Sequence, residues 1–161
     1  MPKKTAILGF GNPVRSDDGV GCFVIEQLRR RFDPLPDWMT LLDMGTSAFE
    51  TLFQLQGHER IILIDAVINS GEPDGTLFCL PATEAMSAVQ EDPMVFLHSL
   101  KWDQALSYAQ KIMGEAFPDD IRVYLVAVSD LRLEVGLSDP IRAAGNRVSD
   151  LIWEHSTAPA V

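Results

Sequence analysis

Three side chains with metal-binding chemistry stand where predicted elements meet loops. Asp18 lies in a long loop after the first apolar segment, Asp65 follows the run Ile-Ile-Leu-Ile, and His98 precedes a long predicted helix. Two carboxylates and one imidazole form an oxygen, oxygen and nitrogen donor set that suits a divalent transition ion. Three protein ligands would leave coordination positions open for a substrate that also contacts the ion. From spacing alone this metal site is a hypothesis.

Each of these residues also has an ordinary structural explanation. Acidic residues before a helix often cap it, which would account for one of the pair Asp17 and Asp18. A carboxylate at a strand end often accepts backbone N–H bonds, and a single histidine is more often structural than catalytic. We assign Asp17 to capping or loop support. His58 and His155 match no motif and are expected to have structural or surface roles.

The Gly9-x-Gly11 pair suggests a dinucleotide-binding loop, but the remaining residues argue against it. That fingerprint needs a third glycine three residues after the second, and here the position is Val14, preceded by Pro13. The loop also carries two carboxylates, which would repel a phosphate. We therefore exclude NAD and FAD, and we expect no organic cofactor.

The elements that must position these residues alternate between strand and helix. Apolar runs bounded by turns predict strands at 5–9, 39–42, 60–64, 76–80 and 122–128, and helical spacing predicts helices at 19–31, 47–55, 99–113 and 139–154. This order predicts an α/β three-layer sandwich, with a mostly parallel five-stranded twisted sheet and helices on both faces. Ligands bind outside the carboxyl ends of such strands, so Asp18 and Asp65 are expected on one rim.

Composition narrows the class of protein. The length of 161 residues predicts a single domain over 1–161, with 156–161 as a frayed tail. A net charge of −10, from 13 basic and 23 acidic residues, argues against nucleic acid or an anionic membrane as a partner. The apolar segment near the N-terminus is too short for a signal peptide, so we expect a cytoplasmic protein.

The two cysteines, Cys22 and Cys79, have no paired metal spacing, and both are expected to be buried, reduced thiols. Cys22 lies in the helix after the first loop without a convincing base beside it, so we do not expect covalent catalysis.

Four motifs in order resemble those of one family. The run Gly9-x-Gly11-Asn12-x-x-x-x-Asp17-Asp18-x-x-Gly21 is similar to the N-terminal signature of the hydrogenase maturation proteases. Asp43-Met44-Gly45-Thr46 resembles the family's Asp-Gly-Gly-Thr stretch, with Met44 replacing the frequent glycine, and Ile64-Asp65-Ala66 resembles its Asp-Ala motif. His98 stands where the family has its metal-binding histidine.

The resemblance implies an endopeptidase that removes a short C-terminal extension from the precursor of a nickel–iron hydrogenase large subunit after nickel insertion. It implies Asp18, Asp65 and His98 as metal ligands, Asp43 as a further site residue, and nickel supplied by the substrate. The first ligand is Glu in some relatives, so the shorter Asp18 would shift the ion slightly. Two alternatives stay open: a non-proteolytic nickel-sensing or chaperone module on the same fold, and a small-molecule metal hydrolase.

Overall fold

The computed structural model describes residues 2–47, 55–84 and 102–157. Its described strands form one five-stranded sheet in the order β2-β1-β3-β5-β4. The strands are β1 (Thr5–Phe10), β2 (Met39–Gly45), β3 (Arg60–Val67), β4 (Leu77–Pro81) and β5 (Asp120–Ala127). All pairs are parallel except β4 with β5, which is antiparallel.

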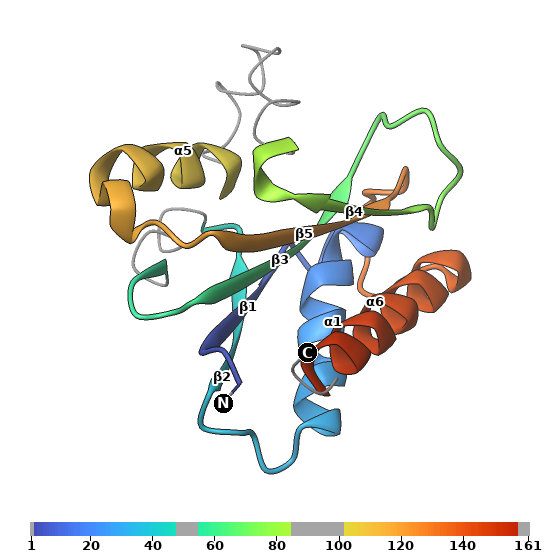
Figure 1. Ribbon diagram of the computed structural model, residues 1–161. Coiled ribbons are helices and arrows are strands. Elements are labelled where there is room, and N and C mark those ends of the chain that lie inside the picture. Colours follow the sequence, from blue (N-terminus) through green and yellow to red (C-terminus); the bar gives the residue numbers. More distant parts are fainter. Residues whose placement is uncertain (1, 48–54, 85–101, 158–161) are drawn as a thin grey trace.

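Helices cover both faces of the sheet, as predicted (Figure 1). The helix α1 (Val20–Arg31) and the helix α6 (Asp139–Thr157) lie together on one face, and α5 (Trp102–Met113) lies on the other. Two short 3-10 helices precede α1 and follow α5, at Ser16–Gly19 and Gly114–Ala116. The described chain therefore forms the three-layer α/β sandwich expected from the sequence.

Alternation along the strands divides the apolar side chains between two cores. Ile62 and Ile64 of β3 pack in the core under α1 and α6, whereas Ile61 and Leu63 pack in the core under α5. Because successive side chains of a strand point to opposite faces, this alternation also fixes the face on which each later residue of β3 lies.

Several element bounds differ from the predicted ones, and two of the differences concern site residues. Asp43 and Asp65 were expected directly after strands, but they lie inside β2 and β3. β2 continues because a register shift around Met44 lets Gly45 pair with Phe10, and β3 continues because β5 pairs with it as far as Val67.

The C-terminal helix is also longer than predicted. Ser156 and Thr157 were assigned to a frayed tail, but both belong to α6. The Thr157 hydroxyl donates a 2.7 Å hydrogen bond to the carbonyl oxygen of Trp153, which extends the last turn. The predicted helix over 47–55 and the position of His98 fall largely or wholly outside the described residues.

The two cysteines differ in exposure. Cys22 is buried, as expected, but Cys79 is exposed because it lies on the edge strand β4, and its predicted burial was wrong. Among the described residues, no helix is long and apolar enough to cross a membrane.

A pair of glycines brings the start of α1 against the end of β1. A Cβ atom on Gly9 would lie 2.5 Å from the carbonyl oxygen of Gly21, and one on Gly21 would lie 2.3 Å from that of Phe10. Both distances are far shorter than any real contact, so only glycine allows these two backbones to touch. This contact places the first turn of α1 directly at the carboxyl ends of the central strands.

Candidate functional site

The carboxyl ends of β1, β2 and β3 form the rim on which the site was predicted. Gly9 of β1 is level with Asp43 on β2 and with Ile64 on β3. Asp65 is one residue further along β3, so the two aspartates come from the strands on either side of β1, about 10 Å apart across the sheet. Asp65 follows Leu63 by two residues and therefore lies on the face covered by α5.

Asp43 is held by two donors, one from its own strand and one from α1. The thiol of Cys22 donates to Oδ1 of Asp43 at 3.1 Å, and the N–H of Gly45 donates to the same oxygen at 3.0 Å. Gly45 has a φ of +57°, a left-handed conformation that suits glycine. Asp43 thus lies on the α1 face of the rim, with its carboxylate fixed from two directions.

Asp18 is fixed by the loop in which it lies. Its Oδ2 accepts a 2.8 Å hydrogen bond from the N–H of Asn12, which closes the loop across six residues. Gly11 has a φ of +133°, and a Cβ there would lie 2.0 Å from the carbonyl oxygen of Asp18. The second glycine of the Gly-x-Gly pair therefore serves the loop's own close packing.

The pKa of the Cys22 thiol is affected by both carboxylates, Asp43 and Asp18. Burial, the hydrogen bond to Asp43 and the negative charges of Asp43 and Asp18 raise the pKa of Cys22 from 9.0 to about 12. At neutral pH the thiol is therefore protonated, and a protonated thiol is a poor nucleophile. This chemistry agrees with the expectation that Cys22 does not act covalently. The charges of Asp18 and Asp43 both act on the Cys22 sulfur, so the two carboxylates lie near the same atom.

Asp65 shows the backbone contact that strand-end carboxylates often make. Its Oδ1 accepts a 2.8 Å hydrogen bond from the N–H of Ala66, and the residue is half-buried. Within residues 2–47, 55–84 and 102–157, no group of three or more His, Cys, Asp and Glu side chains is arranged to hold a metal ion. The predicted ligand set includes His98, which lies outside that part of the chain.

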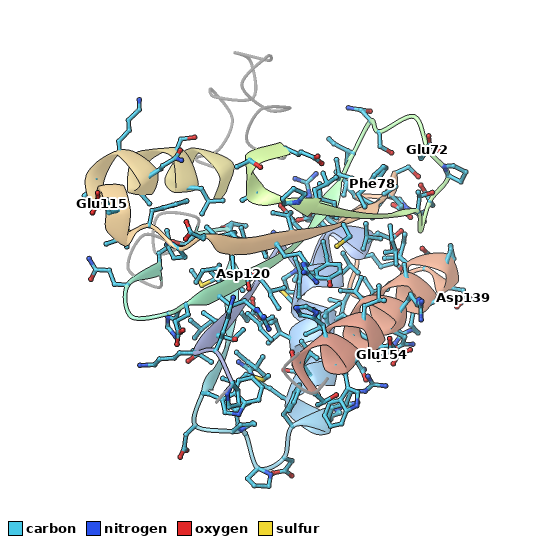
Figure 2. All side chains as sticks on the ribbon, viewed as in Figure 1. Glu72, Phe78, Glu115, Asp120, Asp139 and Glu154 are labelled. Atoms are coloured by element: carbon cyan, nitrogen blue, oxygen red, sulfur yellow. The ribbon has the colours of Figure 1, made fainter. Side chains whose placement is uncertain are left out.

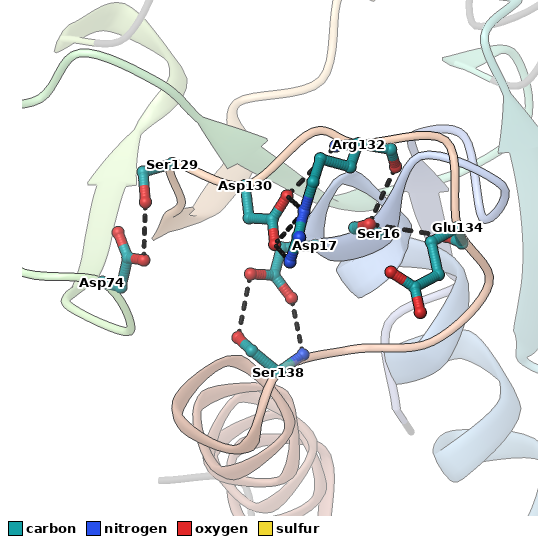
Figure 3. Close-up of polar contacts among 8 residues, drawn as sticks. All are labelled: Ser16, Asp17, Asp74, Ser129, Asp130, Arg132, Glu134 and Ser138. Carbon is teal, nitrogen blue, oxygen red and sulfur yellow. Dashed lines mark hydrogen bonds and ion pairs between the residues drawn. The ribbon is translucent and has the colours of Figure 1, made fainter.

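Asp17 has the supporting role that was predicted for it. It is only 1% exposed, its Oδ1 accepts the backbone N–H of Ser138, and its Oδ2 accepts the Ser138 hydroxyl, both at 2.8 Å (Figure 3). Ser138 immediately precedes α6. Asp17 therefore ties the loop that carries Asp18 to the start of a helix more than a hundred residues away.

Residues 129–138, here called the strap, were not recognised in the sequence as part of the site. The strap runs beside residues 11–19, here called the Asp18 loop. Ser16 joins the two: its N–H donates to the carbonyl oxygen of Glu134 and its hydroxyl to that of Arg132, both at 2.8 Å. Because these bonds use backbone oxygens, no side-chain pattern could have predicted them.

The two histidines that were assigned structural roles lie toward the amino ends of the strands, at the end of the sheet opposite the rim. His58 precedes β3, and its Nε2 lies 3.3 Å from the Thr40 hydroxyl. Burial, followed by the charges of Arg122 and Arg60, lowers the pKa of His155. Arg60 begins β3 and forms a 2.9 Å ion pair with Asp120. Asp120, labelled in Figure 2, begins β5. Both histidines are therefore remote from Asp43 and Asp65.

A hollow of about 340 Å³ opens beside Cys22 and Asp43, on the α1 face. One side comes from the Asp18 loop and α1, and the other from the strap and α6. Its lining comprises Pro13, Ser16, Gly19, Cys22, Phe23, Glu26, Asp43, Val135, Gly136, Leu137 and Arg142. The hollow is large enough for one or two side chains of a bound peptide.

Comparisons with known proteins agree with this architecture. The chain is 28% identical over 137 residues to the hydrogenase 2 maturation protease of Escherichia coli (strain K12), which covers 85% of this chain and 80% of that protein. It is 30% identical over 128 residues to the hydrogenase expression/formation protein HupD of Rhizobium leguminosarum bv. viciae, and spans 60% of that protein's length.

The fold has close structural relatives. The hydrogenase maturating endopeptidase HybD from E. coli superimposes with a TM-score of 0.78 at 23% identity, over 92% of this chain and 89% of that one. The family model described as hydrogenase maturation protease matches residues 22–155, which is most of the chain. The chain therefore belongs to the hydrogenase maturation protease family.

Proposed function

We propose that this protein is a cytoplasmic endopeptidase that removes the C-terminal extension from the precursor of a nickel–iron hydrogenase large subunit after nickel insertion. The observation that carries the proposal is the pair of carboxylates, Asp18 and Asp43, held beside Cys22 on the rim of a hydrogenase maturation protease fold. Asp65 lies at the same carboxyl end of the sheet, on β3, with its side chain on the α5 face, whereas that of Asp43 is on the α1 face.

In this proposal Asp18, Asp65 and His98 contact the nickel ion that the substrate carries. Carboxylate oxygens and an imidazole nitrogen suit a borderline divalent ion, and three protein ligands leave positions for the ligands of the substrate. Nickel is thus part of the substrate. A nickel ion held in this way would act as a Lewis acid toward the scissile carbonyl or an attacking water.

Asp43 contributes differently. Among the described residues, the two donors to this side chain, Cys22 and Gly45, both bind Oδ1. A carboxylate has two acceptor oxygens, so Oδ2 is the one assigned here to a substrate N–H or to a water. A carboxylate with one oxygen fixed keeps its orientation, which favours catalysis because the geometry is set before the substrate binds.

Recognition of the ion explains why processing would wait for nickel. If much of the binding free energy depends on the ion, a precursor without nickel binds poorly and is rejected. Cleavage would then follow metal insertion without a separate sensor. The precursor of the large subunit is the protein partner, and neither nucleic acid nor a membrane is required.

The test is to incubate the purified protein with a nickel-loaded large-subunit precursor and to follow the precursor's mass. Loss of a C-terminal fragment supports the proposal. Stable binding without any change in mass would favour a chaperone, and hydrolysis of small amides with no effect on the precursor would favour a small-molecule hydrolase. The Asp43→Asn protein is the matched control because asparagine retains an acceptor for Cys22 and Gly45 but lacks the charge.

A further inference from the structure

Three exposed apolar side chains lie beside the rim. Leu133 is 83% exposed, Val135 is 78% exposed and Val14 is 47% exposed. Leu133 and Val135 belong to the strap, and Val14 belongs to the Asp18 loop, next to Arg15. Arg15 pairs with Glu134 in an isolated parallel bridge, so the two loops that carry these side chains lie side by side.

Hydrogen bonds fix the strap so that it cannot bury these side chains. Ser16 holds the carbonyl oxygens of Arg132 and Glu134, which are the neighbours of Leu133 in sequence. The Arg132 guanidinium binds the Asp130 carboxylate, with distances down to 2.8 Å (Figure 3). At the far end, Ser138 is held by Asp17. The apolar side chains between these anchors are therefore held in water.

The strap also forms a wall of the hollow beside the candidate site. Val135, Gly136 and Leu137 line it together with Cys22 and Asp43. An apolar surface that is continuous with a hollow at a catalytic rim is typical of a site that binds another protein.

We propose that Val14, Leu133, Val135 and the adjoining hollow form a docking surface for an apolar segment of the large-subunit precursor, next to its scissile peptide. The proposal rests on the proposed function, since Asp43 is one of the residues that line the hollow. It assigns a substrate-binding role to the strap, which the metal and catalytic residues do not require.

Charge favours a protein segment over an anionic surface as the occupant. The hollow contains the carboxylates of Glu26 and Asp43, and the chain carries a net charge of −10. Binding to an anionic membrane needs clustered basic residues beside the apolar ones. Here, on the strap, Arg132 is paired with Asp130, and Arg142 shares the lining of the hollow with Glu26 and Asp43.

The experiment compares the Leu133→Glu, Val135→Glu double variant with wild type on nickel-loaded precursor. Burying one aliphatic side chain is worth about 1.5–3 kcal/mol, or one to two powers of ten in affinity. The double variant should therefore raise KM at least tenfold and leave kcat at saturating precursor within about twofold. The conservative Leu133→Met, Val135→Ile variant should keep the wild-type KM, since it retains an apolar surface.

Ile112→Glu is the matched control, because Ile112 is 78% exposed like Val135 but belongs to α5 on the other face of the sheet. It should leave KM unchanged. An unchanged KM in the double variant, or a loss confined to kcat, would overturn the docking surface while the protease assignment stands. A wild-type dimer that the double variant dissociates would also overturn it, in favour of a second copy as occupant. If wild type leaves the precursor uncut, the proposed function fails and the docking surface with it.

Discussion

The thiol of Cys22 lies 3.1 Å from Oδ1 of Asp43 and donates a hydrogen bond to it. This bond joins the first turn of α1 to β2, two elements that are adjacent only because Gly9 and Gly21 let α1 approach the sheet. The position of a candidate catalytic carboxylate therefore depends on a buried thiol and on two glycines.

Cys22 should resist alkylation in the folded protein, whereas Cys79 should react. The pKa of Cys22 is raised to about 12, so almost no thiolate exists at pH 8, and the side chain is 8% exposed. Cys79 is exposed. Treatment with iodoacetamide at pH 8 followed by peptide mass analysis should find the label on Cys79. Equal labelling of both residues in folded protein would contradict the proposed environment of Cys22.

The raised pKa of Cys22 also predicts how stability depends on pH. The unfolded thiol loses its proton near pH 9.0, and the folded one near pH 12. Folding therefore favours the protonated form, so this contribution is complete below pH 9 and is lost as the pH rises toward 12. Denaturant unfolding should show that the free energy of unfolding of wild type falls relative to that of Cys22→Ser as the pH rises from 9 toward 12. A difference that stays constant up to pH 11 would rule this linkage out.

Asp17 should matter for stability more than its position beside Asp18 suggests. Asp17→Ala removes two hydrogen bonds to Ser138 at a buried position, so we expect the free energy of unfolding to fall by roughly 2–4 kcal/mol. Ser138→Ala, which keeps the backbone N–H, should cost about 1 kcal/mol. Asp37→Ala, at an exposed position, serves as the control. Chemical denaturation measures all three, and equal effects at Asp17 and Asp37 would refute the anchoring role.

The sheet, its helices and the rim were predictable because they follow from local patterns. The run at 61–64 is continuous and apolar, as expected of a strand buried on both faces, and the glycines of the first loop mark a tight turn. The bounds of β2 were missed because Asp43 and Gly45 weaken the strand pattern, and pairing with Phe10 across a register shift outweighs that weakness. The exposure of Cys79 depends on strand order, which no local pattern encodes.

The partners of the site residues were harder to predict for a related reason. The strap contributes through backbone oxygens and through Ser138, at separations above one hundred residues from Ser16 and Asp17. The contact between Cys22 and Asp43 joins residues of a helix and a strand whose relative placement depends on two glycines. Motif spacing identified the carboxylates but not the groups that hold them.

Substitution of the proposed metal-contacting residues should abolish processing without unfolding the protein. Asp18→Asn and Asp65→Asn each retain an oxygen for the N–H groups of Asn12 and Ala66, so the loop and strand are kept while the charge is lost. With His98→Ala, each should lower kcat/KM on nickel-loaded precursor at least a hundredfold, that is by about 2.7 kcal/mol. Melting temperatures should stay near that of wild type.

The controls for these substitutions are the other two histidines. His58→Ala and His155→Ala should keep kcat/KM for processing within about twofold of wild type. Both residues lie toward the amino ends of the strands, at the end of the sheet opposite the rim. Full processing by the Asp65→Asn protein, or a large loss with His155→Ala, would show that the ligands were chosen wrongly.

The isolated protein should hold nickel weakly and act on the ion that its substrate brings. The proposed ligands are two carboxylates and one imidazole from three separate segments, with no thiolate among them, and metal affinity depends on how completely a site is formed before the ion arrives. Cysteine thiolates in the precursor would hold nickel more tightly, so the ternary complex should be stable where the binary one is not. Protein purified without added metal should therefore be largely metal-free by elemental analysis, yet should process nickel-loaded precursor at once and leave nickel-free precursor intact. Adding nickel to the protease alone should not restore cleavage of the nickel-free form.

Two results would contradict this prediction: a stoichiometric metal that survives dialysis against chelator, or efficient cleavage of nickel-free precursor. Either would indicate a metalloprotease that carries its own catalytic ion.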